Sequence, residues 1–305
     1  MWTRLLPAVL AAAASFGAAA ATTGTDTYPT KPIRMIIGFP PGGSDDYLAR
    51  IVGPKLTERL GQSVIVENRA GAAGNVGAEL TSHANPDGYT LFLGPISTLA
   101  ASVSLYPKLG YDLLKDFSYI TPVATQTNVL LAHPTVPAKS FQELVAYARG
   151  GKSLRYGSVG QGSGSHLAME LLKRRTGMAL QHIPYKGGGP AVIALTGGEV
   201  DIGFVALSVA VPMIEAKRLN ALAVTSAKRL AALPSVPTIA ESGVPGFNMI
   251  ASFGILAPAG TPAALVKRLN AEIRSILEME DVRAKFAARG MDAEAATPDA
   301  FERRV

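Results

Sequence analysis

Short apolar runs with the composition of β-strands alternate with helical patterns along most of the chain. This alternation predicts parallel sheets with helices on both faces. In sheets of this kind, ligands bind at the carboxyl ends of the strands, so the loops that follow the strands are the candidate site. The predicted strands are residues 33–37, 64–67, 90–93, 119–123, 130–133, 154–158, 181–183, 202–205, 221–224 and 253–257, and the predicted helices are 46–60, 74–84, 140–148, 165–176, 188–196, 209–215, 262–277 and 282–289.

The N-terminus has the pattern of an export signal peptide. Arg4 supplies positive charge, residues 5–14 are apolar, and four alanines at 18–21 offer a cleavage site. The alternative is a membrane anchor, but an apolar run of roughly 17 residues is short against the ~20 that span a bilayer. We therefore expect a signal peptide over 1–21, cleavage near Ala21 and a periplasmic protein.

Composition narrows the function further. The chain has 305 residues and no cysteine, which excludes disulfides, a thiol nucleophile, thiolate metal sites and a lipid-anchored cysteine. A mature length of ~285 residues predicts two domains. The formal net charge of +6 is dispersed, with no basic stripe interleaved with aromatic residues, so no nucleic acid partner is expected.

A glycine- and serine-rich loop joins the first predicted strand to its helix. Free N–H groups at a helix start, together with the helix dipole, favour an anion there. The alternative is an ordinary strand–helix turn with a capping side chain. Asp45 adds negative charge, so it either caps the helix or favours a ligand with a donor group. The candidate ligand-binding residues here are Phe39, Pro41, Gly42, Gly43, Ser44 and Asp46.

A second loop of the same kind, residues 160–166, follows the predicted strand 154–158. Ser163 and Ser165 offer hydroxyl donors, and Gly164 exposes a backbone N–H group. A carboxylate that receives two or three such bonds needs no arginine. His166 contacts the ligand or, as its position favours, holds the loop by a hydrogen bond. Two such loops, ~120 residues apart, predict two lobes that grip one small anion.

Nine segments in order along the mature chain resemble the Bug-type substrate-binding proteins of tripartite tricarboxylate transporters. These segments are YPTKPI at 28–33, FPPGGSDD at 39–46, VENRAGAAGN at 66–75, PDGYTL at 86–91, LYPKL at 105–109, SGSHL at 163–167, HIPYKG at 182–187, LAVTSAKR at 222–229 and LAPAGTP at 256–262.

The resemblance implies an α/β, type II periplasmic-binding-protein fold with two doubly wound lobes and a cleft between them. We assign 22–128 and 252–305 to lobe 1 and 129–251 to lobe 2. The expected protein binds a small carboxylate and passes it to the membrane permease subunits of the transporter. It is expected to be a monomer without cofactor or metal and not an enzyme. By resemblance, Ser163, Gly164 and Ser165 lie against the ligand carboxylate.

Other loops complete the predicted cleft. Ser97 and Thr98 follow the strand 90–93, and Tyr185 follows 181–183. Val205 and Ala206 stand where the relatives often carry an aspartate and a polar residue. We therefore hypothesise a ligand without an amino group and with a more apolar body than aspartate, such as an aliphatic or aromatic carboxylate.

Two other functions compete with this prediction. A hydrolase is suggested only by the short distance along the chain between Ser163 and His166. The sequence has no G-x-S-x-G elbow and no H-E-x-x-H metal motif. A ligand-sensing accessory protein for a membrane signalling system needs the same closing cleft as a carrier, so the sequence leaves that alternative open.

Overall fold

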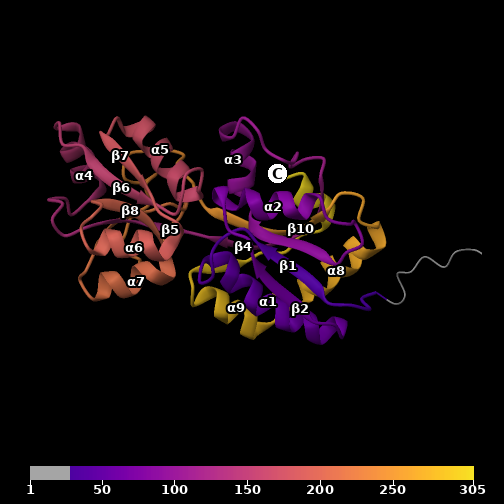
Figure 1. Ribbon diagram of the computed structural model, residues 1–305. Coiled ribbons are helices and arrows are strands. Elements are labelled where there is room, and N and C mark those ends of the chain that lie inside the picture. Colours follow the sequence, from indigo (N-terminus) through magenta and orange to yellow (C-terminus); the bar gives the residue numbers. More distant parts are fainter. Residues whose placement is uncertain (1–27) are drawn as a thin grey trace, which may run out of the picture.

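The computed structural model describes residues 28–305, so the predicted signal peptide at 1–21 lies outside the described residues. The chain forms two α/β lobes, each built around its own sheet (Figure 1). The first sheet has the strand order β11-β4-β10-β3-β1-β2. Its strands are β1 (Ile33–Ile37), β2 (Val64–Asn68), β3 (Thr90–Pro95), β4 (Phe117–Gln126), β10 (Ala251–Pro258) and β11 (Met291–Ala293).

The second sheet has the order β7-β6-β8-β5-β9 and lies in the other lobe. Its strands are β5 (Asn128–Ala132), β6 (Leu154–Ser158), β7 (Leu180–Pro184), β8 (Ile202–Ala206) and β9 (Asn220–Val224). The helices are α1 (Ser44–Leu60), η1 (Ala72–Gly74), α2 (Asn75–Ser82), α3 (Ile96–Leu105), α4 (Phe141–Arg149), α5 (Gly164–Thr176), α6 (Gly188–Thr196), α7 (Leu207–Glu215), α8 (Ala263–Leu277), α9 (Glu280–Ala287) and α10 (Pro298–Glu302).

Alternating side chains bury both faces of each sheet. In β1, Met35 and Ile37 point into one buried cluster, and Ile36 points into another on the opposite face. In β5, Leu130 and Leu131 divide between two clusters of the second lobe in the same way. Helices cover both faces, as the strand–helix alternation predicts.

The prediction of parallel sheets is correct for the strands that precede helices and wrong for the strands near the lobe crossing. β1 pairs in parallel with β2 and β3, and β6 does so with β7 and β8. In contrast, β10 runs antiparallel to β3 and β4, and β5 runs antiparallel to β8 and β9. These strands carry the chain from one lobe to the other, which sets their direction independently of βαβ geometry.

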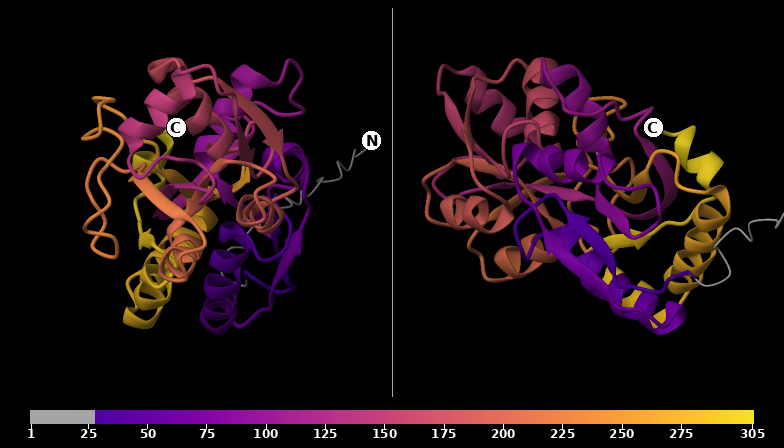
Figure 2. Two further views of the ribbon diagram at one scale, coloured as in Figure 1. Left: turned by 90° about the vertical axis from the view of Figure 1, so that its left-hand side faces the viewer. Right: turned by 45° about the vertical axis from the view of Figure 1, so that its right-hand side comes forward.

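The C-terminal part of the chain returns to the first lobe. After β10, helices α8 and α9 pack beside α1, and the yellow C-terminal elements lie next to the indigo N-terminal ones in Figure 2. The last strand, β11, pairs with β4 at the edge of the first sheet. The first lobe is therefore held by contacts between segments that are far apart in sequence.

The predicted strands and helices are all present, with ends displaced by at most three residues. The prediction missed α3, α10, η1 and β11. Helix α3 begins directly after β3 with small residues and no clear periodicity, so residues 96–98 read as a loop. The short α10 and β11 have five and three residues, too few for a periodic pattern.

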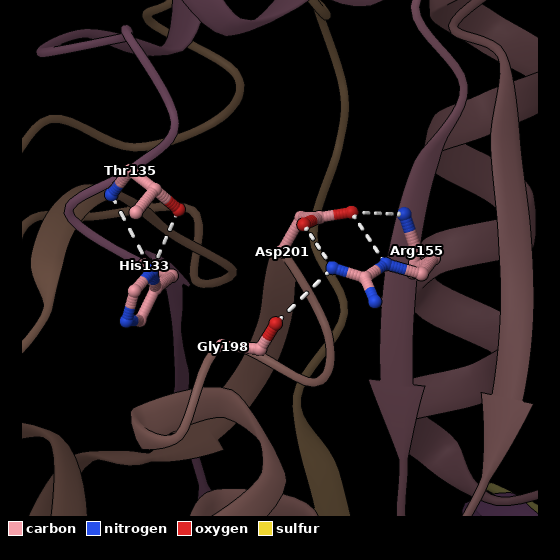
Figure 3. A network of polar contacts seen from close by, with 5 residues as sticks. All are labelled: His133, Thr135, Arg155, Gly198 and Asp201. Atoms are coloured by element: carbon pink, nitrogen blue, oxygen red, sulfur yellow. Dashed lines mark hydrogen bonds and ion pairs between the residues drawn. The ribbon is translucent and has the colours of Figure 1, made fainter.

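A polar network braces the end of the second sheet that lies opposite its strand-to-helix loops (Figure 3). Arg155, near the start of β6, donates to both carboxylate oxygens of Asp201, which precedes β8; the shorter of these guanidinium bonds is 2.8 Å. Arg155 also donates to the Gly198 carbonyl at 3.1 Å. Burial alone would raise the pKa of Asp201, but the bonds from Arg155 lower it. The network joins β6 to β8 and leaves their carboxyl ends free to shape a site.

Candidate ligand-binding cleft

A cavity of about 530 Å³ lies between the lobes, where β1 and β3 of one sheet and β6 and β8 of the other reach their carboxyl ends. Both predicted loops contribute to its wall. Eleven of the predicted site residues line it: Phe39, Pro41, Gly42, Gly43, Ser44, Thr98, Ser163, Gly164, Ser165, Val205 and Ala206.

The first loop begins α1 without a side-chain cap. Gly43 is the N-cap residue, and glycine has no side chain that could cap the helix. Gly42 has a φ of +87°, a left-handed conformation that favours glycine. The Ser44 hydroxyl donates to Oε1 of Gln126 at 2.8 Å instead of capping the helix. The N-terminus of this 17-residue helix therefore meets the cavity with N–H groups available.

Asp46 lies behind the loop and does not line the cavity, contrary to the predicted ligand contact. Its carboxylate accepts bonds from the Gly42 N–H at 2.9 Å, Asn68 Nδ2 at 3.1 Å and Arg50 Nε at 3.0 Å. Burial would raise its pKa, but the bonds from Arg50, Gly42 and Asn68 lower it. Asp46 is thus an ionised clamp that fixes the loop.

Asp45 is the acidic side chain that does line the cavity. It is 3% exposed, and its Oδ2 atom has no hydrogen-bond partner among residues 28–305. Burial raises the pKa of Asp45 to about 7. The backbone N–H groups of Asp45 and Asp46 act against this increase, and the Asp46 charge adds a smaller increase. Of the two alternatives for Asp45, capping of the helix is not observed, because Gly43 is the N-cap residue. A ligand with a donor group remains the other.

The second loop is held by bonds within itself. Ser163 caps α5: its hydroxyl accepts from the His166 N–H at 3.4 Å and donates to the Gly160 carbonyl at 2.6 Å. The Ser165 hydroxyl accepts from the Val159 N–H and lies 3.2 Å from that of Ser163. The two serines therefore shape the loop before any ligand arrives.

His166 does not line the cavity and holds the loop by a hydrogen bond, which is the favoured one of its two predicted roles. Its Nδ1 accepts from the Gly162 N–H at 3.1 Å, and its ring stacks on His182 with centroids 4.1 Å apart. His182 also stacks on Tyr156 and bonds to the Ser158 hydroxyl at 2.6 Å. Burial lowers the pKa of both imidazoles, that of His182 to about 4, so the stack is neutral at pH 7.

Ser97 and Tyr185 also lie outside the wall. Ser97 is exposed on the first turn of α3, where its hydroxyl accepts from the Ser252 N–H at 3.4 Å. Tyr185 packs into the second lobe beside Gly157 and Val200. The residue after Ser97, Thr98, reaches the cavity because the next position of the helix turns inward.

Sequence reasoning missed several polar residues of the wall. Gln126 and Asn128 stand at the junction of β4 and β5, and Arg289 follows α9. The crossing between lobes is the signal that could have identified the first two, because both crossing strands pass the cleft. Much of the remaining wall is apolar, with Val192, Leu195, Phe204, Val209, Phe253 and Met291.

The lobes touch across the cleft. The Tyr106 hydroxyl, at the end of α3, donates to the Gln161 carbonyl of the second loop at 3.2 Å. Gly290 approaches α7 so closely that an added Cβ would lie 2.5 Å from Cβ of Leu207. These contacts join the two lobes.

The described residues contain no group of three or more histidine or acidic side chains that could hold a metal ion. The Ser163 hydroxyl bonds to backbone groups and to Ser165, and it makes no bond to the His166 ring. Ser158 does bond to His182, but it is 1% exposed and does not line the cavity. Between residues 28 and 305, no helix is long and apolar enough to cross a membrane.

Comparison with known proteins gives consistent matches. The family model described as "Tripartite tricarboxylate transporter family receptor" matches residues 48–303. Protein BugT of Bordetella pertussis is 40% identical over 300 residues, which cover 97% of this chain and 91% of that protein. These matches confirm the resemblance drawn from the sequence motifs.

Two solved structures share the fold at similar identity. The R. palustris protein Rpa4515, described with adipate, has a TM-score of 0.85 and 34% identity, covering 91% of this chain and 93% of that one. MatC from Rhodopseudomonas palustris, described with bound malate, has a TM-score of 0.81 and 34% identity, covering 87% and 90%. The predicted two-lobed periplasmic-binding-protein fold is confirmed.

Proposed function

Because the chain belongs to the tripartite tricarboxylate transporter family of receptors, we propose that it captures a small carboxylate between its lobes and delivers it to the membrane permease of such a transporter. The observation that carries the proposal is the convergence of two helix starts, those of α1 and α5, on one cavity. Each start offers N–H groups and a positive dipole end to an anion.

The wall supports a carboxylate with an apolar body. Serine and threonine hydroxyls and the helix N–H groups are the donors of the wall. Hydrogen bonds from such donors to an anion are charge-assisted and strong. Val205 is 6% exposed and lines the cavity with Ala206, in place of a counter-charge for an ammonium group. Two related proteins are described with adipate and with malate, which are both dicarboxylates.

Capture proceeds when lobe 1, formed by 22–128 and 252–305, and lobe 2, formed by 129–251, close onto each other. A ligand that bonds to both loops favours the closed state by its difference in affinity for the two states. The closed surface is what the permease recognises. The protein acts as an exported periplasmic monomer, cleaved near Ala21, and as a carrier rather than an enzyme.

A thermal-shift screen against mono- and dicarboxylates, starting with adipate and malate, tests the proposal. A ligand that binds only the folded state at 100 times its Kd adds about 2.7 kcal/mol of stability. Ala206→Trp should abolish the shift by filling the cavity, whereas Leu114→Trp, at a side chain that is 64% exposed outside the wall, should leave it unchanged. A carboxylate panel without any shift in the unaltered protein would refute carboxylate capture.

A further inference from the structure

Two buried polar atoms in the cavity wall have no bonding partner. These are Oδ2 of Asp45 and Nε2 of Gln126, whose side chains belong to residues 3% and 5% exposed. The other orphaned side-chain atoms among residues 28–305 belong to Arg274 and Glu294, which do not line the cavity. Buried polar groups normally find partners, so a pair of orphans on one wall points to a ligand that satisfies both.

The orientation of Gln126 is fixed by the first loop. Its Oε1 accepts from the Ser44 hydroxyl at 2.8 Å, which leaves the amide NH₂ as the unpaired group. Nε2 can only donate, so its partner is an acceptor such as a carboxylate oxygen. Asp45 can accept when it is ionised or donate when it is protonated, and the two states select opposite ligand groups.

We propose that Asp45 binds the ligand as a neutral carboxylic acid, and that Asp45 and Gln126 both donate hydrogen bonds to a carboxylate of the ligand. Capture then takes up one proton for each ligand bound when Asp45 is ionised in the free protein. This inference rests on the proposed function and deepens it, since it names two residues that recognise the anion and the protonation state that recognition requires.

The charges around Asp45 favour the neutral form. Asp46, on the same helix, is an ionised neighbour of like charge. Lys186 from the β7–α6 loop and Arg289 after α9 also line the cavity, but both are exposed, and neither forms a salt bridge with Asp45. Arg289 lies over the ring of Tyr47, 4.6 Å from its centroid.

A bound anion shifts the balance further. With the lobes in contact, burial already raises the pKa of Asp45 to about 7. A carboxylate within ~4–6 Å disfavours a second negative charge and raises that pKa again. An ionised Asp45 would instead suit a ligand ammonium group, for which Val205 and Ala206 provide no second counter-charge.

The test is the pH dependence of binding, measured by calorimetry with adipate and malate between pH 6 and 8.5 in two buffers of different ionisation enthalpy. If neither binds, the carboxylate with the largest thermal shift replaces them. The unaltered protein should lose affinity about tenfold for each pH unit above ~7, and the heat should reveal proton uptake. Asp45→Asn, which donates at every pH, should bind with a Kd that is flat over this range.

Asp45→Ala should bind more weakly than Asp45→Asn, because the donor is lost. Asp299→Asn, at an exposed acid of α10, should keep the slope of the unaltered protein. Tight binding at pH 8.5 that Asp45→Asn abolishes would show an ionised acceptor and overturn the inference, as would a Kd independent of pH in the unaltered protein. Failure of every carboxylate to bind at any pH would refute the proposed function itself.

Discussion

The two loops that meet at the cleft start helices in the same way but satisfy their polar groups differently. In the second loop, Ser163, Ser165 and His166 bond to one another's backbone or to neighbours, and a histidine stack supports them from behind. In the first loop, the helix has no side-chain cap, and the wall keeps two orphaned atoms, on Asp45 and Gln126.

This difference suggests a division of labour. A loop whose bonds are complete before binding is a rigid platform that loses little entropy when the ligand arrives. In a loop with unsatisfied buried groups, those groups have lost their hydrogen bonds to water, which destabilises the folded protein. A ligand that bonds to them restores the lost bonds. We therefore expect changes in the second loop to affect folding as well as binding, and changes in the first loop to act mainly on binding and on its pH dependence.

The largest expected effect is a gain in stability when the orphaned acid is neutralised. The pKa of Asp45 in the folded protein, about 7, lies above the ordinary value of 3.8. Stability is therefore lost as pH rises from about 4 to 7 and stays low above that range. At pH 8, Asp45→Asn should have a free energy of unfolding higher than that of the unaltered protein by on the order of a few kcal/mol, and hence a higher urea midpoint. At pH 4 the two midpoints should be nearly the same.

Equal urea midpoints for the two proteins at pH 8 would contradict the raised pKa. Asp299→Asn is the matched control, because it removes an exposed acid and should not change the midpoint.

The next effect is a loss of stability in the second loop. Ser163→Ala removes the cap of α5 and leaves the Gly160 carbonyl without its 2.6 Å partner. The Gly160 carbonyl keeps its bonds from the Ser158 hydroxyl and the backbone N–H of residue 163. Loss of the cap and of one hydrogen bond should therefore cost about 1–2 kcal/mol of unfolding free energy, measured in urea without ligand. Ser140→Ala, which removes the cap of α4 outside the cleft, should cost a similar amount without changing carboxylate affinity.

A Ser163→Ala protein that is as stable as the unaltered one would mean that the second loop does not depend on its internal bonds. The comparison between the two loops would then fail.

The sequence predicted the strand–helix order and the two loops because both depend on local signals. Strand composition, glycine-rich turns and helical periodicity can be read within ten or fifteen residues. Ser140, three residues before Glu143, has the spacing of a capping box, and its hydroxyl does accept from the Glu143 N–H at 3.2 Å. The pair Thr261-Pro262 likewise predicts a threonine cap before an N1 proline, but this prediction is wrong. The Thr261 hydroxyl donates to the Pro258 carbonyl, and Pro262 is the N-cap residue.

What the sequence could not predict depends on distant segments. Gln126 joins the wall because β4 and β10 pair across the first sheet and bring the crossing strand to the cleft. Asp46 and His166 do not line the cavity. Asp46 accepts a hydrogen bond from Asn68, and the His166 ring stacks on His182, both of which belong to other elements of the fold. Neighbouring residues in a first helical turn point in different directions, so Asp45 faces the cavity and Asp46 does not.

A smaller effect should come from the histidine stack behind the second loop. The pKa of His182 in the folded protein, about 4, lies below its ordinary value of 6.5, with burial as the main cause and His166 as the next. Stability is thus complete above pH 6.5 and falls as pH drops toward 4. His182→Gln should show a shallower loss of urea midpoint between pH 6.5 and 4.5, and His83→Gln, outside the stack, should not.

The smallest effect is expected at the first loop's serine. Ser44→Ala removes the 2.8 Å bond to Gln126 and no helix cap, because Gly43 and not Ser44 is the N-cap residue. Unfolding in urea should change by less than about 1 kcal/mol. Carboxylate affinity should fall by about 0.5–1.5 kcal/mol, since Gln126 is no longer held in the orientation that presents its NH₂ group. Calorimetry measures the change in affinity, and the urea series measures the change in stability. A loss of stability as large as that of Ser163→Ala would show that the first loop depends on its internal bonds as the second does.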